Sequence, residues 1–166
     1  GHPERAGGLL QEMRVMAGEF GFFRLEVLAR LTLADMFVVE SAELATSILP
    51  NRSHSIFLTT HGPYLRARQS LTEARIAARQ GKFHLSNRLA NVALKHARRS
   101  ELGRLEVAAL LCTAVACAGT GRAALSEQRV ADAIDIASRL GCYRTLLDER
   151  WHMEALGSIW TPLLNI

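Results

Sequence analysis

The chain has 166 residues, of which 49% are hydrophobic and 22% are charged, and its formal net charge is +4. This apolar content excludes a disordered tail, and the length fits one compact core or one short repeat array. The longest apolar stretch, residues 107–121, is shorter than the roughly 20 residues that a membrane-spanning helix needs. Because Gly119 and Gly121 also close it, we expect a buried helix there.

Apolar residues at helical spacing predict an all-α protein without strands. In chain order, the predicted helices span residues 4–20, 22–40, 42–49, 63–80, 83–99, 101–118, 124–140 and 149–164. The clearest interruption lies between Pro50 and Pro63 and begins with a polar stretch, residues 51–55. The last helix, which carries Trp151, Met153 and Trp160, keeps the spacing poorly and suggests an irregular end.

An internal repeat of 40 residues appears when the chain is shifted against itself. Small residues at 41, 81 and 121 end one helix of each unit and turn the chain into the next. The matching positions are Leu25, Leu65 and Leu105, then Leu31, Leu71 and Leu111, then Ala34, Ala74 and Ala114, and in the second helix Met13, Ala93 and Ala133 with Ala17, Ala97 and Ala137.

Each unit is therefore a hairpin of two helices that cannot bury both apolar faces alone, so neighbouring hairpins must stack. The alanines four residues apart in the second helices let two helices approach closely. The sequence predicts a TPR-like superhelix of antiparallel helical hairpins with a repeat of about 40 residues. We expect residues 1–166 to form a single domain of this kind and to be a fragment of a longer chain.

Five segments of the repeats form a distinctive set: Gln80-Gly81-Lys82 through Ala97, Arg104 through Leu110, Thr120-Gly121-Arg122, Ala133 through Ala137, and Gly141 through Glu149 with Cys142 inside. These segments resemble the C-terminal sensor region of MalT-like transcriptional activators, the large ATP-binding members of the LuxR family. The resemblance covers most of residues 78–155 well and residues 4–49 loosely, and the end of the last repeat is its most telling part.

In that family a nucleotide-binding module precedes the repeats, and a helix-turn-helix closes the chain. These 166 residues contain neither a phosphate-loop motif nor a helix-turn-helix signature. The resemblance therefore implies a part that senses a small-molecule inducer or a regulatory protein, while DNA is bound only through a separate domain that is absent from this chain. The 34-residue TPR signature is not matched, and a free-standing TPR-like adaptor for protein–protein interaction remains the alternative, with an enzyme of unrecognised pocket as a second.

The candidate chemical groups favour structural roles. Cys112 and Cys117 are five residues apart on an apolar helix, which places them on different faces without a second ligand pair. The histidines are scattered singly, and no serine lies in a nucleophile elbow. We find no nucleophile with a base and no perturbed acid pair. The sequence thus predicts no catalytic residue, no metal site and no cofactor. The paired spacing of a disulfide framework and a charged leader with an apolar run are also missing, so we expect a cytoplasmic setting and no membrane partner.

Charge is the one uneven feature. Residues 65–104 hold ten Lys or Arg and two acids, whereas residues 1–64 and 105–166 each hold five basic and seven acidic residues. First helices usually line the concave side of such a stack. The expected ligand or partner groove is therefore formed by Tyr64, Arg68, Thr72, Arg75 and Arg79, although an ordinary solvated helix face explains the same charges. The equivalent positions one repeat earlier are Leu28, Thr32, Asp35 and Val39.

Overall fold

The computed structural model describes residues 3–50 and 62–149, and every regular element in these two ranges is a helix. The prediction of an all-α chain is confirmed. The helices are α1 (Pro3–Glu19), α2 (Phe23–Phe37), α3 (Ala42–Ile48), α5 (Pro63–Arg79), α6 (Phe83–Arg99), α7 (Gly103–Gly119), α8 (Ala123–Leu140) and α9 (Tyr143–Asp148). None of these described helices is long and apolar enough to span a membrane.

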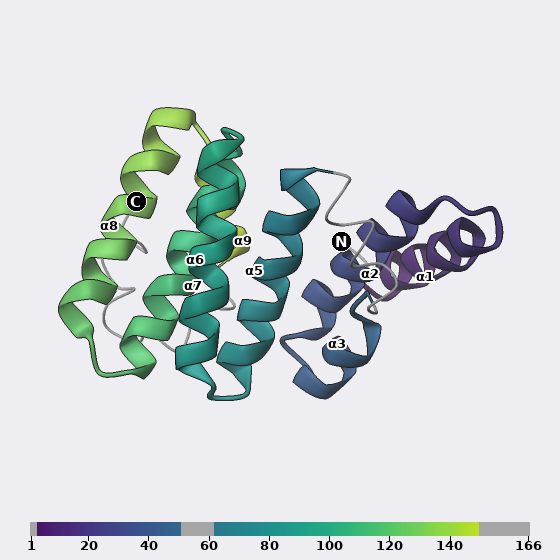
Figure 1. The fold of residues 1–166 in the computed structure, drawn as a ribbon, viewed down its shortest axis with the longest axis horizontal. Coiled ribbons are helices and arrows are strands. Elements are labelled where there is room, and N and C mark those ends of the chain that lie inside the picture. The colour runs from purple at the N-terminus through teal and green to yellow at the C-terminus, as the bar shows by residue number, and fades with distance from the viewer. Residues whose placement is uncertain (1–2, 51–61, 150–166) are drawn as a thin grey trace.

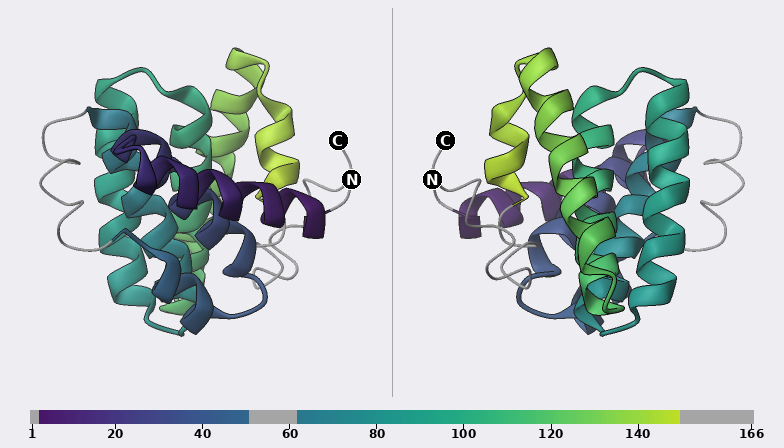
Figure 2. Two further views of the ribbon diagram at one scale, coloured as in Figure 1. Left: turned by 90° about the vertical axis from the view of Figure 1, so that its right-hand side faces the viewer. Right: turned by 90° about the vertical axis from the view of Figure 1, so that its left-hand side faces the viewer.

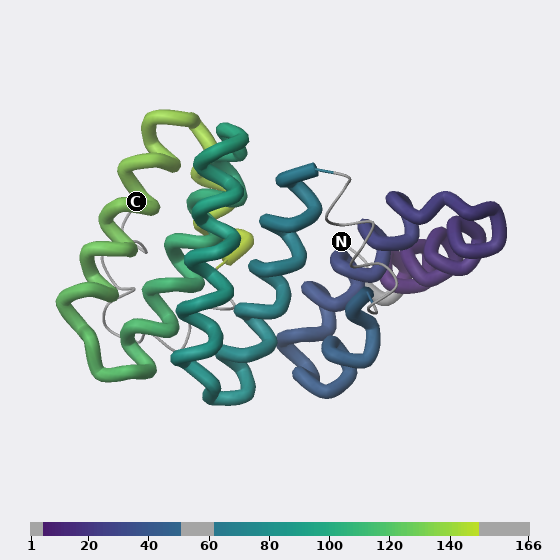
Figure 3. Tube along the Cα trace, in the orientation of Figure 1, coloured from purple at the N-terminus to yellow at the C-terminus, as the bar shows by residue number. Residues whose placement is uncertain are grey.

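The helices follow one another across the molecule, from α1 at one end to α8 at the other (Figure 1). Helices α5 to α8 run up and down in turn, whereas α1 lies across their direction (Figure 2). The tube in Figure 3 shows the short turns that join α5, α6, α7 and α8 in succession. Helix α6 packs against α5 and α7, and α8 packs against α7 and α9. The two side views in Figure 2 show the hairpins behind one another along the long axis. This helical-repeat arrangement is the one that the 40-residue period predicts.

The helix starts repeat the period directly. Helices α2, α5, α7 and α9 begin at residues 23, 63, 103 and 143, and α1, α6 and α8 begin at residues 3, 83 and 123. We call the former the first helices and the latter, with the short α3, the second helices. Successive first helices contact one another, since α5 touches α2 and α7, and α7 touches α9. The first helices therefore form a continuous row, which we call the inner row.

One turn geometry joins most helices and recurs at a spacing of 20 residues. The amide of Lys82 donates to the carbonyl of Ala77 at 2.9 Å, and the equivalent amides of residues 22, 102, 122 and 142 donate in the same way to residues 17, 97, 117 and 137. The residue before each of these amides has a positive φ, as in the Schellman motif that satisfies the last carbonyls of a helix. The turn at residue 41 differs: Ser41 is extended and caps α3 by accepting the Leu44 amide at 3.1 Å.

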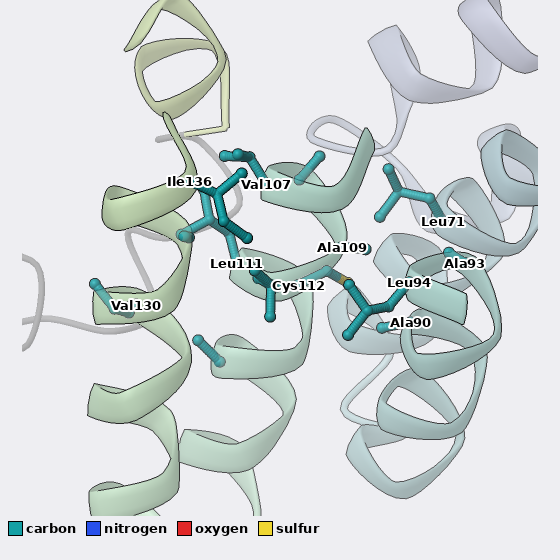
Figure 4. Packing of buried hydrophobic residues seen from close by; sticks show 14 of the residues in the cluster. Leu71, Ala90, Ala93, Leu94, Val107, Ala109, Leu111, Cys112, Val130 and Ile136 are labelled. Carbon is teal, nitrogen blue, oxygen red and sulfur yellow. The ribbon is translucent and has the colours of Figure 1, made fainter. Parts of the chain in front are cut away.

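The core lies between α5, α6, α7 and α8, with α7 at its centre. Every residue from Val107 to Cys117 is buried, which confirms the buried helix that the apolar stretch predicts. Figure 4 shows Leu111 and Cys112 of α7 between residues of α6 and α8. The predicted contact alanines Ala93, Ala97, Ala133 and Ala137 are at most 1% exposed. The buried Ser126 hydroxyl donates to the Ala114 carbonyl at 2.8 Å and so joins α8 to α7.

The last predicted helix is placed wrongly at its start. Residues 149–164 were expected to be helical, but a six-residue helix, α9, already spans Tyr143–Asp148, and Glu149 is its C-cap. The 40-residue register explains this start, because Tyr143 follows Gly103 by one period. The rest of the predicted helix, with Trp151, Met153 and Trp160, lies outside the described residues, as does the polar stretch 51–55.

The close approach of helices at the alanines predicts a sharp sensitivity to added volume. Ala93→Leu and Ala133→Leu should each lower the free energy of unfolding by about 1–3 kcal/mol, because the extra methyl groups overpack a helix contact. Thermal or urea unfolding measures this. Ala131→Leu, at an exposed position of the same helix as Ala133, is the control and should change stability by less than about 0.5 kcal/mol. Equal stability of all three variants would contradict the hairpin packing.

The repeated turn gives a second prediction: two substitutions at equivalent positions of the turn should change the free energy of unfolding in opposite directions. Glu101 has a φ of 53°, while the equivalent residues of two other turns, Gly81 and Gly121, have φ values of 71° and 75°. A side chain costs about 1–2 kcal/mol in this left-handed conformation. Glu101→Gly should therefore stabilise the fold by about 1 kcal/mol, and Gly81→Ala should destabilise it by about the same amount, as measured by urea unfolding. Changes of the same sign in both variants would contradict this turn geometry.

Candidate functional site

The five residues predicted for a groove lie on α5, but they do not line an open surface together. Thr72 is fully buried and Arg75 is only 8% exposed. Tyr64 and Arg79 are exposed, and Arg68 is half-buried. The structure thus separates the predicted set into two buried residues that face other helices and three residues that reach solvent. Whether any of them binds a ligand stays a prediction.

Arg68 and Arg75 converge on one carboxylate of the preceding first helix. Nη1 of Arg75 donates to Asp35 at 2.7 Å, and Nη2 of Arg68 donates to the other oxygen of Asp35 at 3.3 Å. Arg68 also donates to the hydroxyls of Thr32 at 3.2 Å and Tyr64 at 3.4 Å. Asp35 therefore joins two helical turns of α5 to α2.

The second nitrogen of the Arg75 guanidinium pairs with Glu149, at the end of α9. Arg75 thereby links α2 to α9 through the middle of the inner row. We call Asp35, Arg68, Arg75 and Glu149 the inner-row network. It holds two acids and two arginines, so its formal charge is zero when both acids are ionised.

The repeat explains where the contacts of α5 to α2 fall. Asp35 and Arg75 are 40 residues apart, and so are Val39 and Arg79, whose guanidinium donates to the Val39 carbonyl. A period of 40 residues places equivalent positions of two first helices beside each other in the stack. The acid at position 35 therefore faces the arginine at position 75 because of the register.

Burial and charge act against each other within the network. Burial raises the pKa of Asp35, but the positive charges of Arg75 and Arg68 outweigh it, so that the pKa is lowered. Burial also raises the pKa of Glu149, and there the charge of Arg75 does not overcome it. Desolvation lowers the pKa of Arg75, but Glu149 and Asp35 reverse this and hold it above its usual value. Two carboxylates therefore keep the guanidinium charged, and their pKa values are shifted in opposite directions.

Two atoms near the network bear on its chemistry. Nε of Arg75 is buried and has no hydrogen-bond acceptor among the described residues. The thiol of Cys112 on α7 is buried, and burial raises its pKa to about 11 against the opposing charge of Arg75. Because the thiolate is the reactive form of cysteine, Cys112 is a poor nucleophile. Its burial, and that of Cys117, confirm the prediction that both fill the core.

No cluster of three or more His, Cys, Asp or Glu within residues 3–50 and 62–149 is placed to hold a metal ion. The inner-row network pairs acids with arginines and brings no activated nucleophile to them. Its paired charges join helices that are far apart in the sequence.

Half of the basic residues in 65–104 lie outside the inner row. The exposed side chains of α6 include Arg88, Lys95 and Arg99, and His96 on the same helix has a lowered pKa through burial and the charges of Arg66, Arg99 and Lys95. Arg98 is paired with Glu106 at 2.8 Å. The uneven charge of residues 65–104 therefore divides between a neutralised inner network and a solvated outer helix face, which supports the alternative explanation for the outer part.

Sequence reasoning missed both acids of the network. Asp35 was identified as the repeat equivalent of Arg75 without being paired with it, and the signal was the opposite charge one period apart. Glu149 was recognised only as part of the family resemblance. Its pairing with Arg75 depends on the position of α9, which was not predicted.

The network gives a prediction on stability and its dependence on pH. Asp35→Asn should lower the free energy of unfolding by about 3–5 kcal/mol at pH 7, because two arginines lose their shared carboxylate and one of them is buried. The pKa of Asp35 is lowered in the fold, so this contribution is present above its ordinary value of 3.8 and is lost as pH falls through the lowered value. The difference in the free energy of unfolding between wild type and Asp35→Asn should therefore become smaller in acid.

Unfolding by urea at pH 7 and at pH 3 measures both effects. Asp148→Asn is the matched control, because Asp148 pairs with Arg144 in an exposed i,i+4 geometry that contributes about 0.3–0.5 kcal/mol. Glu149→Gln should behave in the opposite way to Asp35→Asn. Because the pKa of Glu149 is raised in the fold, its contribution to the free energy of unfolding falls as pH rises above its ordinary pKa. The loss of stability in Glu149→Gln relative to wild type should therefore become smaller with rising pH. A pH-independent deficit in both variants would contradict the network.

The chain is similar to proteins named HTH-type transcriptional regulator AlkS. It is 33% identical over 156 residues to that of Alcanivorax borkumensis (strain SK2), which covers 93% of this chain and 18% of the relative. It is 31% and 30% identical over 141 residues to those of Ectopseudomonas oleovorans and Pseudomonas putida, which covers 85% of this chain and 16% of each relative. The chain thus spans less than a fifth of the length of these curated relatives. No family model and no solved structure matches it.

Proposed function

We propose that the chain is the effector-sensing or protein-binding helical-repeat part of a bacterial transcriptional regulator of the MalT-like type within the LuxR family. The observation that carries the proposal is the similarity of 93% of the chain to a protein named as a transcriptional regulator, together with a stack of helical hairpins that has no assembled catalytic group in its described part. Under this proposal the chain forms part of a TPR-like superhelix and works in the cytoplasm.

The proposed mechanism is a shift of population between two states of the whole regulator. A small-molecule inducer or a regulatory protein binds the repeat surface and favours one state over the other, which requires unequal affinity for the two. DNA is bound by a separate domain outside these 166 residues. The inner-row network supports this mechanism because Arg75 touches both α2 and α9, so that a change in one hairpin alters contacts in another.

The coding sequence on both sides of this segment tests the assignment. A phosphate-loop motif upstream and a helix-turn-helix downstream are the expected findings, since a nucleotide-binding module and a DNA-binding domain flank the repeats in MalT-like regulators. A gene that encodes neither would favour the free-standing adaptor. Turnover of any metabolite by the purified chain would favour an enzyme instead.

The absence of a phosphate-loop motif predicts that the purified chain does not bind ATP. Such a loop supplies the backbone amides and the lysine that hold the phosphates, and the 166 residues contain no such sequence. Calorimetric titration with Mg-ATP should show no binding in the micromolar range, and no phosphate should be released. Micromolar affinity would contradict the proposal that nucleotide is bound by a separate module outside this chain.

The solvent-facing cations of α5 give a prediction on partner binding. If Arg68 and Arg79 attract an anionic inducer or an acidic segment, binding of a polyglutamate peptide should weaken as salt is raised. Arg79→Ala should lower the affinity by roughly 1–3 kcal/mol, because it removes an exposed charged donor. Arg68→Ala and Arg75→Ala are poor probes, since both arginines pair with Asp35 and their loss would weaken the fold. Arg99→Ala on α6 is the control, and an equal loss in both variants would remove the groove assignment.

A further inference from the structure

Large apolar side chains gather on the surface where α1 turns into α2. Phe20 is 67% exposed and Met16 is 56% exposed, and the rings of Phe20 and Phe22 lie 6.3 Å apart. The side chains line a groove of about 330 Å³ in which Glu12 is the one charged residue. We call Leu9, Met13, Met16, Phe20, Phe22 and Leu25 the N-terminal apolar surface. Exposed apolar patches of this kind mark binding surfaces.

The repeat register shows what covers the same positions in the other hairpins. Met16 corresponds to Ile136 of α8, which is 8% exposed, in a helix that packs against the first helix α7. Leu25 corresponds to Leu65 of α5, which is 1% exposed and packs against Val27 and Leu31 of the preceding first helix. Met16 and Leu25 are therefore exposed at positions where Ile136 and Leu65 are buried elsewhere in the stack.

The side chains of α1 also specify the shape of their partner. Position 13 holds a methionine, whereas the equivalent residues of α6 and α8, Ala93 and Ala133, are alanines pressed against a first helix. A helix that packs on α1 at the same distance needs small residues opposite Met13 to make room for it. The surface thus fits an amphipathic helix with an apolar stripe that contains small side chains.

We propose that the N-terminal apolar surface binds the first helix of a further 40-residue hairpin, which packs antiparallel to α1 as α5 packs on α6 and α7 packs on α8. The proposal rests on the proposed function, under which the chain is part of a longer regulator. The chain spans 18% of the relative that it matches over 93% of its own length, so ample chain outside these residues exists in such proteins to supply the helix.

Methionine oxidation by hydrogen peroxide, followed by mass spectrometry, tests the proposal on the 166-residue chain and on the longer gene product that contains it. Met16 should oxidise readily in the 166-residue chain and at least about tenfold more slowly in the longer protein, since the helix would cover its sulfur. Met36, which is already half-buried on α2, is the internal control and should oxidise at the same rate in both.

A substitution gives a second readout. Met16→Glu should leave the melting temperature of the 166-residue chain nearly unchanged and lower that of the longer protein by several degrees, because only there does the carboxylate become buried. Val92→Glu, at an exposed valine of α6, is the matched control and should have little effect in either protein.

Three outcomes would overturn the proposal. The first is equal oxidation of Met16 in both proteins. The second is protection of Met16 in the 166-residue chain that grows with protein concentration, because a second copy would then be the occupant. The third is a gene that encodes no helix before Gly1. Protection of Met16 in a longer protein without a phosphate loop or a helix-turn-helix would support this inference while overturning the proposed function, so the two failures are distinguishable.

Discussion

The spacing of 20 residues that recurs from one turn to the next is the constraint on which the rest of the structure depends. Successive turns with a residue of positive φ lie at 81, 101, 121 and 141, so each helix presents the same positions to its neighbours. An inserted residue would rotate the following helix by about 100°, since an α-helix has 3.6 residues per turn. It would also move the contact alanines out of their interface. The Schellman turn keeps this spacing because it satisfies the helix carbonyls locally.

The same register decides where charges meet. Because equivalent positions of α2 and α5 lie side by side, the acid at Asp35 receives two arginines from the next repeat. The central hairpin carries the basic excess of the chain, and this network neutralises part of that charge on the inner row, while Arg88, Lys95 and Arg99 of α6 stay exposed. A stack that couples hairpins through such contacts suits a part that transmits a change of state.

The fold could be predicted largely from the sequence because its repeat is strong. The helices α5 and α6 begin at the predicted residues, and the burial of Ala93 and Ala133 follows from the register. The candidate site was less accessible. Arg68 and Arg75 were singled out by their charge, but the pattern of one helix does not show which of its residues face another helix. Glu149 and Arg75 are 74 residues apart in the sequence. Their pairing depends on α9, a helix too short to show a periodic apolar pattern of its own.

The central claim is that the 40-residue register brings Asp35 and Arg75 into one partly buried contact. A double-mutant cycle with Asp35→Asn, Arg75→Met and both together, read by urea unfolding, tests it most directly. The account predicts a coupling energy of at least about 1.5 kcal/mol between the two sites, because each charge is costly to bury without the other. Additive effects within about 0.5 kcal/mol would contradict the contact and the lateral register from which it follows.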